Sequence, residues 1–304
     1  MVQNAWRVVD CTQLEGKLRY TRGRLLVCPA EGNKAEIPLA QLAVVLLGQR
    51  ASCSTALLFQ LAQYGVSVML CDWRGVPAGA LHSWSDTASV VTRRHHAQVE
   101  MSKPRCKNAW AQIVKSKIRG QAHCLDLCDR HGGEELRALA KTVRSGDSTN
   151  VEGQAARKYW QWLFDEKEKF HRSPGSGEGR NSQLDYAYAV LRGFVVRSIC
   201  AAGLAPTFGV NHHNRANYFC LADDLIEPYR PAVDRQVALM DVDEDGLSPQ
   251  TKKDLVNAVN TQFDKNGLTI PSSIDAFAQQ FGIYCESKDR MLSVPVFGGD
   301  DEER

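Results

Sequence analysis

The spacing of apolar residues changes near residue 90, and this change is the feature that most constrains the fold. Before it, the short apolar runs WRVV, KLRY, RLLVC and AEIPL are separated by Gly16, Gly23 and the turn at 31–33. Short runs between turn residues predict β-strands. After residue 90, apolar residues recur every three or four positions, which predicts helices. We therefore expect an α+β chain with a β-rich domain at 1–90 and a larger all-α domain at 91–285.

One helix is expected inside the β-rich domain. It starts at Ser54, carries Leu57, Leu58 and Leu61, and stops at Gly65, and the run VSVMLC after it predicts a strand. We expect antiparallel strands to dominate this domain.

The strongest helical pattern lies in the second domain. Its apolar stripe consists of Trp110, Val114, Ile118, Ala122 and Leu125. The stretch HRSPGSGEGRNSQ (171–183) predicts a break, and LDYAYAVLRGFVVRSICAAG predicts a helix that ends at Gly203. The chain after Met240 is polar and is expected to be frayed, and residues 286–304 form its polar, acidic tail.

Charge is distributed unevenly along the chain. Residues 1–240 hold 31 basic and 22 acidic side chains, whereas 241–304 hold 6 and 13. A basic body indicates a polyanionic partner such as nucleic acid, and an ordinary soluble surface is the alternative. Within the basic segment 91–130, a solvated helix face is the alternative to contact with DNA phosphates. The candidate DNA-binding residues are Lys103, Arg105, Lys107, Lys115 and Arg119.

Cysteine usage and hydropathy favour a cytoplasmic protein. The ten cysteines include no C-x-x-C pair, which is typical of small core residues in a reducing compartment. The first ten residues lack a signal-peptide pattern. Residues 51–71 carry no charge, but polar residues and Gly65 interrupt them, so we expect no membrane span.

The acidic run DVDEDGLSPQTK (241–252) begins like a calcium loop. Its twelfth position, where a bidentate Glu belongs, is Lys252, and Pro249 occupies the ninth. A cation there would repel calcium, so an acidic turn is the better interpretation.

Glu152 has two interpretations. With Thr149 it forms a T-x-x-E capping box, which would use the carboxylate to close a helix start. It also lies on the apolar stripe of Ala155, Tyr159 and Leu163, where a buried carboxylate needs a partner. Both a cap and a metal ligand remain open from the residues alone.

Residues 209–234, GVNHHNRANYFCLADDLIEPYRPAVD, place two histidines before three carboxylates. Asp223 and Asp224 precede Glu227 by four and three positions, so a helix would bring at least two carboxylates together. Such a cluster needs a neutralising cation, and histidine with several carboxylates suits Mg²⁺ or Mn²⁺ better than zinc. Salt bridges to Arg215 or Arg230 are the alternative.

The two histidines are expected to differ. If TFGVNHH is extended, Phe208, Val210 and His212 share one side, which we expect to face the interior, and His213 points the other way. This interpretation favours His212 as the metal ligand.

The segments TNVEGQAAR, NSQLDYAYAVLRG and GVNHHNRANYFCLADDLIEPYRPAVD resemble signature segments of the CRISPR-associated spacer integrases, the adaptation endonucleases called Cas-one. ALLFQLAQYGVSVMLCDWRGVPAGAL and AWAQIVKSKIRGQAHCL extend the resemblance over most of residues 1–235, and LADDLIEPYRP is most similar to the type II subgroup. The resemblance implies a β-sandwich-like N-terminal domain that dimerises and a helical catalytic domain. It also implies that Glu152, His212 and Glu227 bind Mg²⁺ or Mn²⁺, with Asp224 in support, and His212 lies fifteen residues before Glu227 as the family pattern requires.

The activity implied by the resemblance is integration of short protospacer duplexes into a CRISPR array, in antiviral defence. The implied partners are double-stranded DNA, a second copy of the chain, the small second adaptation protein and the type II effector nuclease. A structure-selective repair nuclease and a nonenzymatic nucleic-acid-binding subunit are the alternatives.

Overall fold

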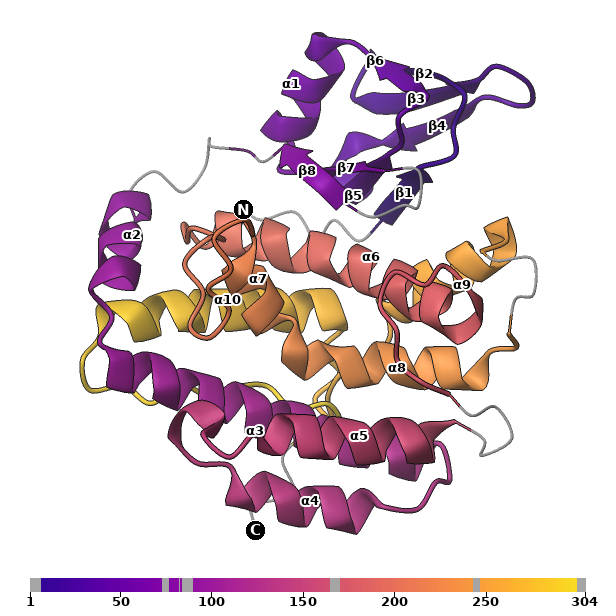
Figure 1. Cartoon of the computed structure of the whole chain (residues 1–304). Helices are drawn as coiled ribbons and strands as arrows, with labels where there is room; N and C mark the ends of the chain where they lie inside the picture. The colour runs from indigo at the N-terminus through magenta and orange to yellow at the C-terminus, as the bar shows by residue number, and fades with distance from the viewer. Residues whose placement is uncertain are drawn as a thin grey trace.

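The computed structural model describes residues 7–72, 77–81, 83, 90–164, 170–242 and 247–299. Two four-stranded sheets and a helix form the first part of the chain, and a body of helices forms the rest, as the sequence predicts (Figure 1). The strand orders are β1-β5-β7-β8 and β4-β3-β2-β6. The elements are β1 (Arg7–Cys11), β2 (Gly16–Thr21), β3 (Arg24–Pro29), β4 (Ala35–Pro38), β5 (Leu42–Leu47), β6 (Ala51–Cys53), α1 (Thr55–Gln63), β7 (Ser67–Cys71) and β8 (Pro77–Leu81).

The two sheets share one hydrophobic core, which makes the first part sandwich-like. Leu18 and Leu25 from one sheet, Val45 and Val68 from the other, and Leu57 of α1 belong to the same buried cluster. The predicted start of α1 is confirmed, because the Ser54 side chain accepts a hydrogen bond from the backbone N–H of Leu57.

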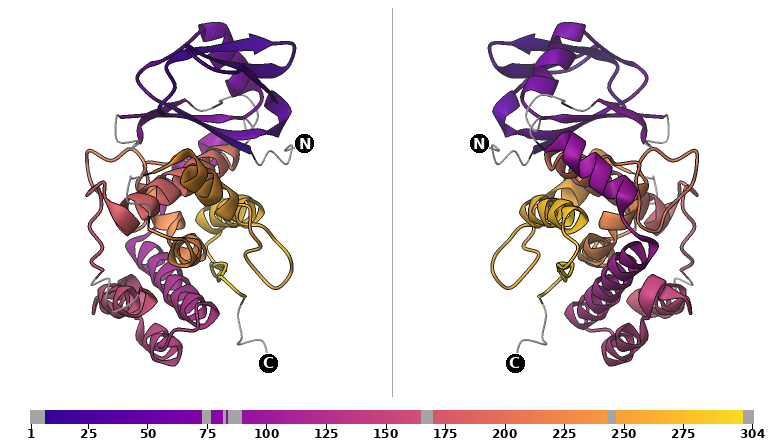
Figure 2. Two further views of the ribbon diagram at one scale, coloured as in Figure 1. Left: turned by 90° about the vertical axis from the view of Figure 1, so that its right-hand side faces the viewer. Right: turned by 90° about the vertical axis from the view of Figure 1, so that its left-hand side faces the viewer.

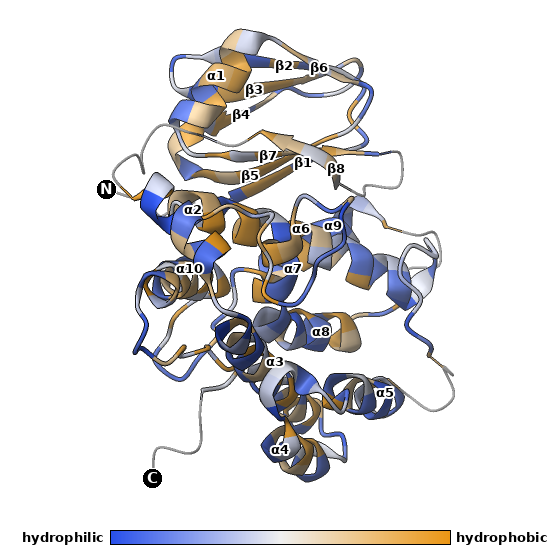
Figure 3. Ribbon diagram, turned by 60° about the vertical axis from the view of Figure 1, so that its left-hand side comes forward, coloured by the Kyte–Doolittle hydropathy of each residue, from blue (hydrophilic) through white to orange (hydrophobic). Residues whose placement is uncertain are grey.

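The expectation that antiparallel pairs dominate is wrong. Among the described strands, β1–β5, β5–β7 and β2–β6 pair in parallel, and only β2–β3, β3–β4 and β7–β8 are antiparallel. Every residue of β5 (LAVVLL) is buried, because the second sheet covers one face and α6 (Gly179–Ala201) the other (Figure 1). A continuous apolar run of this kind is typical of a parallel strand covered on both faces. Figure 3 shows the hydrophobic colour of β5 between these layers.

The helical body runs from α6, under the sheet, to α3, α4 and α5 at the far end (Figures 1 and 2). The predicted stripe on α3 is confirmed, with all five residues at most 3% exposed. No helix in the described ranges is long and apolar enough to cross a membrane. The elements besides α6 are α2 (Val91–Glu100), α3 (Lys103–Leu127), α4 (Gly133–Thr142), η2 (Ser145–Asp147), α5 (Val151–Leu163), α7 (Cys220–Leu225), η4 (Glu227–Tyr229), α8 (Arg230–Leu239), α9 (Pro249–Ala258) and α10 (Ile270–Glu286).

Two boundaries differ from expectation. Helix α6 begins at Gly179, inside the stretch expected to be a break, and Arg180 anchors its first turn by donating to the carbonyl oxygen of Val237, 2.6 Å away. The frayed tail is also wrong for residues 287–299, because the tail residue Phe297 is only 6% exposed and packs beside Phe263. The acidic residues at 243–246 and the last residues, 300–304, lie outside the described residues.

Candidate active site

Helix α3 forms the floor of the candidate site. Trp110 and Lys117 are two turns apart on this helix and therefore lie on the same face. The Trp110 ring meets the His212 ring edge-on, with centroids 5.8 Å apart. The Lys117 ammonium contacts the carboxylates of Glu152 and Glu227, two of the predicted metal ligands.

Glu152 lies in the first turn of α5, and its carboxylate does not cap that helix. The N-cap residue is Asn150, whose side chain accepts from the backbone N–H of Gly153, and Asp147 accepts from the N–H groups of Val151 and Glu152. The capping-box interpretation is therefore wrong, since these donors are already satisfied. The Glu152 carboxylate instead lies 2.6 Å from Lys117 Nζ.

Glu227 begins the short helical turn η4 and is 5% exposed. Its Oε1 accepts from Arg230 Nε at 2.9 Å, and its Oε2 lies 2.6 Å from Lys117 Nζ. The Lys117 contact is an ion pair without hydrogen-bond geometry, so Oε2 is a buried oxygen that accepts no hydrogen bond from the described residues. Part of the salt-bridge alternative is thus correct, because Arg230 does pair with Glu227.

Neighbouring charges determine the protonation states of Glu227 and Lys117. Burial by itself would raise the pKa of Glu227, but Arg230 and Lys117 outweigh it and hold that pKa below its ordinary value. Burial would likewise lower the pKa of Lys117, but Glu227 and Glu152 outweigh it and raise that pKa. Glu227 is therefore an anion and Lys117 a cation at neutral pH.

Asp224 is fully buried and fixes the loop that carries His212. Its Oδ2 accepts from the N–H groups of Val210 (2.6 Å) and Asn211 (3.1 Å), and its Oδ1 accepts from that of His212 (3.2 Å). Oδ1 also lies 2.7 Å from His212 Nδ1. This hydrogen bond raises the pKa of His212, and it leaves Nε2 as the ring nitrogen that can bind a ligand.

The reasoning that favoured His212 is partly wrong. Residues 207–213 form a loop and not a strand, and Phe208 is 42% exposed. His213 is exposed, whereas His212 is held by Asp224 and Trp110. Asp223 points elsewhere, because its carboxylate pairs with Arg192 at 2.8 Å.

The donor set fits a divalent cation only in part. Two carboxylates and an imidazole are ligands that Mg²⁺ and Mn²⁺ accept, and Glu227 Oε2 is an oxygen that such an ion would bind in place of Lys117. Yet no three His, Cys, Asp or Glu side chains within the described ranges lie close enough to hold one ion together. Lys117 occupies the position between the two glutamates.

The five candidate DNA-binding residues do not behave alike. Lys103 and Lys107 are exposed, and Lys115 and Arg119 are half-buried. Arg105 is engaged internally, since it donates to the carbonyl oxygens of Tyr284 (2.6 Å) and Lys288 (2.7 Å).

Sequence reasoning missed the role of Lys117, which it counted only as one more basic residue of the 91–130 segment. A signal was present, because Lys117 lies three positions after Val114 and seven after Trp110, on the buried side of α3.

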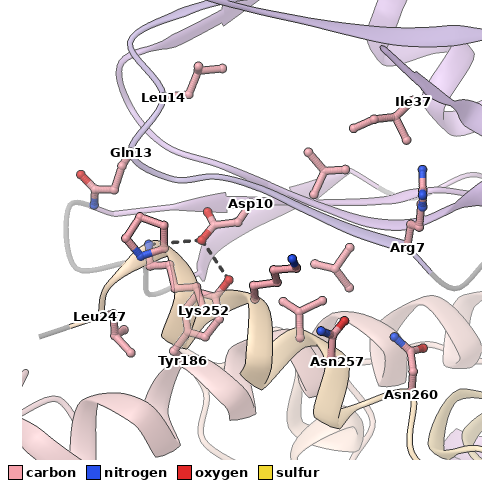
Figure 4. A pocket seen from close by; sticks show the side chains of 15 residues that line it. Arg7, Asp10, Gln13, Leu14, Ile37, Tyr186, Leu247, Lys252, Asn257 and Asn260 are labelled. Atoms are coloured by element: carbon pink, nitrogen blue, oxygen red, sulfur yellow. Dashed lines mark hydrogen bonds and ion pairs between the residues drawn. The ribbon is translucent and has the colours of Figure 1, made fainter. Parts of the chain in front are cut away.

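A separate pocket of about 770 Å³ lies between β1 and α9, and none of the predicted metal-site residues lines it (Figure 4). Asp10 projects into it beside Lys252 and Tyr186. The Asp10 carboxylate accepts from the Tyr186 hydroxyl at 2.9 Å and pairs with Lys252 at 3.2 Å. Lys252, the cation that argued against a calcium loop, thus connects α9 to β1.

The fold and the site together define a class. A sandwich-like unit is joined to a helical body in which Glu152 and Glu227 meet at one lysine and Asp224 anchors His212, a combination that the resemblance noted in the sequence leads one to expect in a CRISPR-associated endonuclease. The family model for CRISPR associated protein Cas1 matches residues 11–244. The chain is 34% identical over 302 residues to the CRISPR-associated endonuclease Cas1 of Neisseria meningitidis, covering 95% of this chain and 96% of that one. The chain therefore belongs to the Cas1 family of CRISPR-associated endonucleases.

Other relatives and solved structures agree. A Cas1 endonuclease of Francisella tularensis is 29% identical over 236 residues, 71% of this chain and 73% of that one. A Cas1 protein from Thermotoga maritima has the same fold (TM-score 0.75, 17% identity, 97% of this chain and 100% of that chain). So does a casposase bound to an integration product (TM-score 0.75, 19% identity, 94% and 92%).

Proposed function

We propose that this protein is a metal-dependent DNA integrase that inserts short protospacer duplexes into a CRISPR array. The observation that carries the proposal is the convergence of Glu152 and Glu227 on one cationic position beside the Asp224-anchored His212. The casposase neighbour, bound to its integration product, supports a strand-joining activity over simple cleavage.

In this proposal the protein's own residues bind and orient. Glu152 and Glu227 would hold Mg²⁺ or Mn²⁺ through their oxygens and His212 through Nε2, while Asp224 keeps the ring in place. The bound cation would neutralise charge on the phosphodiester and assist ionisation of the attacking hydroxyl. The new bond joins the 3′-oxygen of the incoming strand to phosphorus, the bond to the old 3′-oxygen breaks, and the proton passes to that leaving oxygen. No ATP is required, because one phosphodiester replaces another.

The proposed assembly follows the family. Structures titled as Cas1–Cas2 complexes share this fold, with TM-scores of 0.75 and 0.62. We propose a homodimer formed through the N-terminal sandwich, a Cas2 partner, double-stranded DNA as substrate, and a type II system in which the effector nuclease takes part. The proposed site of action is the prokaryotic cytoplasm.

The test is strand transfer into a plasmid that carries a CRISPR repeat, in Mg²⁺ or Mn²⁺. We expect Glu152→Ala and Glu227→Ala each to reduce integration by about 100-fold or more, because each removes a ligand. Asp10→Ala, which removes a carboxylate outside the site, is the matched control and should integrate at the wild-type rate.

Three other results would contradict the proposal. Integration by either glutamate variant at the wild-type rate would show that the ligand assignment is wrong. Cleavage of branched DNA without joining would indicate a repair nuclease. DNA binding without any metal-dependent reaction would indicate a nonenzymatic subunit.

A further inference from the structure

The Lys117 ammonium is shared by two carboxylates. Nζ lies 2.6 Å from Glu152 Oε1 and 2.6 Å from Glu227 Oε2, and the three side chains are only 13%, 27% and 7% exposed. Lys117 lies one helical turn from the buried Val114 and Gln121 on α3, so its side chain extends along the buried side of that helix.

Each partner depends on the other. An ammonium on the buried side of a helix is costly unless anions surround it, and Glu152 and Glu227 provide them. Conversely, two carboxylates brought to one point repel each other unless a cation lies between them. Arg230 contacts Glu227 and is not among the ion pairs of Glu152, so only Lys117 joins the two glutamates among the described residues.

The Lys117 ammonium also occupies the position between the two carboxylates that a divalent cation would take. A nitrogen 2.6 Å from both oxygens leaves no room between them for a second positive ion. Lysine carries its charge on a flexible four-carbon chain, so Nζ can withdraw without any movement of the helix.

We propose that Lys117 is a resident cation of the active site: it holds Glu152 and Glu227 together before a divalent ion binds, and it competes with that ion for their oxygens. This inference rests on the proposed function, in which the two glutamates are metal ligands. Its consequence is that competition from Lys117 weakens metal binding by the free protein.

Lys117→Met tests the proposal, since it keeps an apolar chain of similar length and removes the charge. Without metal, we expect the variant to melt several degrees below wild type, because the glutamates then repel each other. Its affinity for Mn²⁺, measured by titration of the full chain in the absence of DNA, should be about tenfold tighter or more. Mn²⁺ should therefore raise its melting temperature further than that of wild type.

Lys115→Met is the matched control. It removes the same charge from the same helix, and the structure shows no ion pair between Lys115 and either glutamate among the described residues. Its melting temperature and Mn²⁺ affinity should match those of wild type.

A second variant keeps the test decisive if Lys117→Met folds poorly. The double variant Lys117→Met/Glu152→Gln removes the repulsion together with the cation, and it should recover the wild-type melting temperature without metal. A double variant as unstable as the single one would overturn the proposal.

The Mn²⁺ titration distinguishes failure of the role proposed for Lys117 from failure of the proposed metal site. Equal or weaker Mn²⁺ binding by Lys117→Met, in a wild-type protein that does bind the ion, would overturn the role of Lys117 alone. If neither protein binds Mn²⁺, the metal site fails and this inference fails with it.

Discussion

The carboxylates of the active site and Asp10 beside the 770 Å³ pocket are satisfied in different ways. The Asp10 carboxylate accepts from the backbone N–H of Thr12 (2.7 Å) and from the Thr12 hydroxyl (2.6 Å). It also accepts from the Tyr186 hydroxyl and forms an ion pair with Lys252. One carboxylate thus meets one ammonium and several donors. At the active site, the Lys117 ammonium is shared by two carboxylates, and Arg230 pairs with Glu227 alone.

The difference separates a structural ion pair from a reactive one. Asp10 accepts from several donors, and its contacts with Tyr186 and Lys252 join β1 to α6 and α9. Two carboxylates that share one ammonium still repel each other in part, and this favours replacement of that ammonium by a divalent cation. The predictions below are designed to break or to sharpen this contrast.

The largest effect is expected at His212. His212→Ala should reduce metal-dependent integration by about 100-fold, because it removes a ligand that Asp224 positions. His213→Ala is the control from the neighbouring position and should retain most activity. Assay of both variants on one substrate decides the assignment, and the reverse pattern would assign the role to His213.

An intermediate effect is expected at the Asp10–Lys252 ion pair. Asp10→Ala should lower the free energy of unfolding by about 2 kcal/mol, since it leaves Lys252 and the Thr12 donors without their acceptor. Denaturant titration measures this change. A loss of integration with unchanged stability would contradict the contrast, because Asp10 would then act in the reaction.

A third buried carboxylate should give the smallest effect. Asp234 accepts from the Tyr159 hydroxyl at 3.0 Å and from that of Tyr188, and burial raises its pKa to about 7 from 3.8. A raised pKa stabilises the folded state below 3.8, and this contribution is lost as the pH rises through 7. Between about pH 6 and 8, wild type should therefore lose about 1.4 kcal/mol relative to Asp234→Asn. Parallel stability curves for the two proteins would show that Asp234 is already ionised.

The sequence correctly predicted features that depend only on residues close together in the chain. The stripe on α3 and the Ser54 cap follow from spacing and from one hydrogen bond, and both are confirmed. The parallel strand β5 was missed because a short run buried on both faces shows no period. The capping box failed because Asn150 and Asp147 took the helix donors first.

Residue patterns offered Glu152 and the 212–227 segment as separate candidates, and only the family resemblance combined them into one site. Glu152 and Glu227 are far apart in the sequence, and nothing local specifies that one lysine of α3 joins them. The role of His212 was inferred from a strand that does not exist, although the structure does hold this ring against Asp224.

The C-terminal segment has a consequence for any shortened form of the chain. Phe297 packs against Gly120 of α3, and the Ser116 hydroxyl donates to the carbonyl oxygen of Pro295. The segment therefore covers one face of the helix over the turn that contains Lys117. These residues belong to the tail predicted at 286–304, which one would remove to obtain a smaller catalytic fragment, although its acidic run lies at 300–303. Removal would instead uncover one face of α3, the helix from which Lys117 reaches the two glutamates, so we expect a fragment that ends before residue 295 to have a less rigid site.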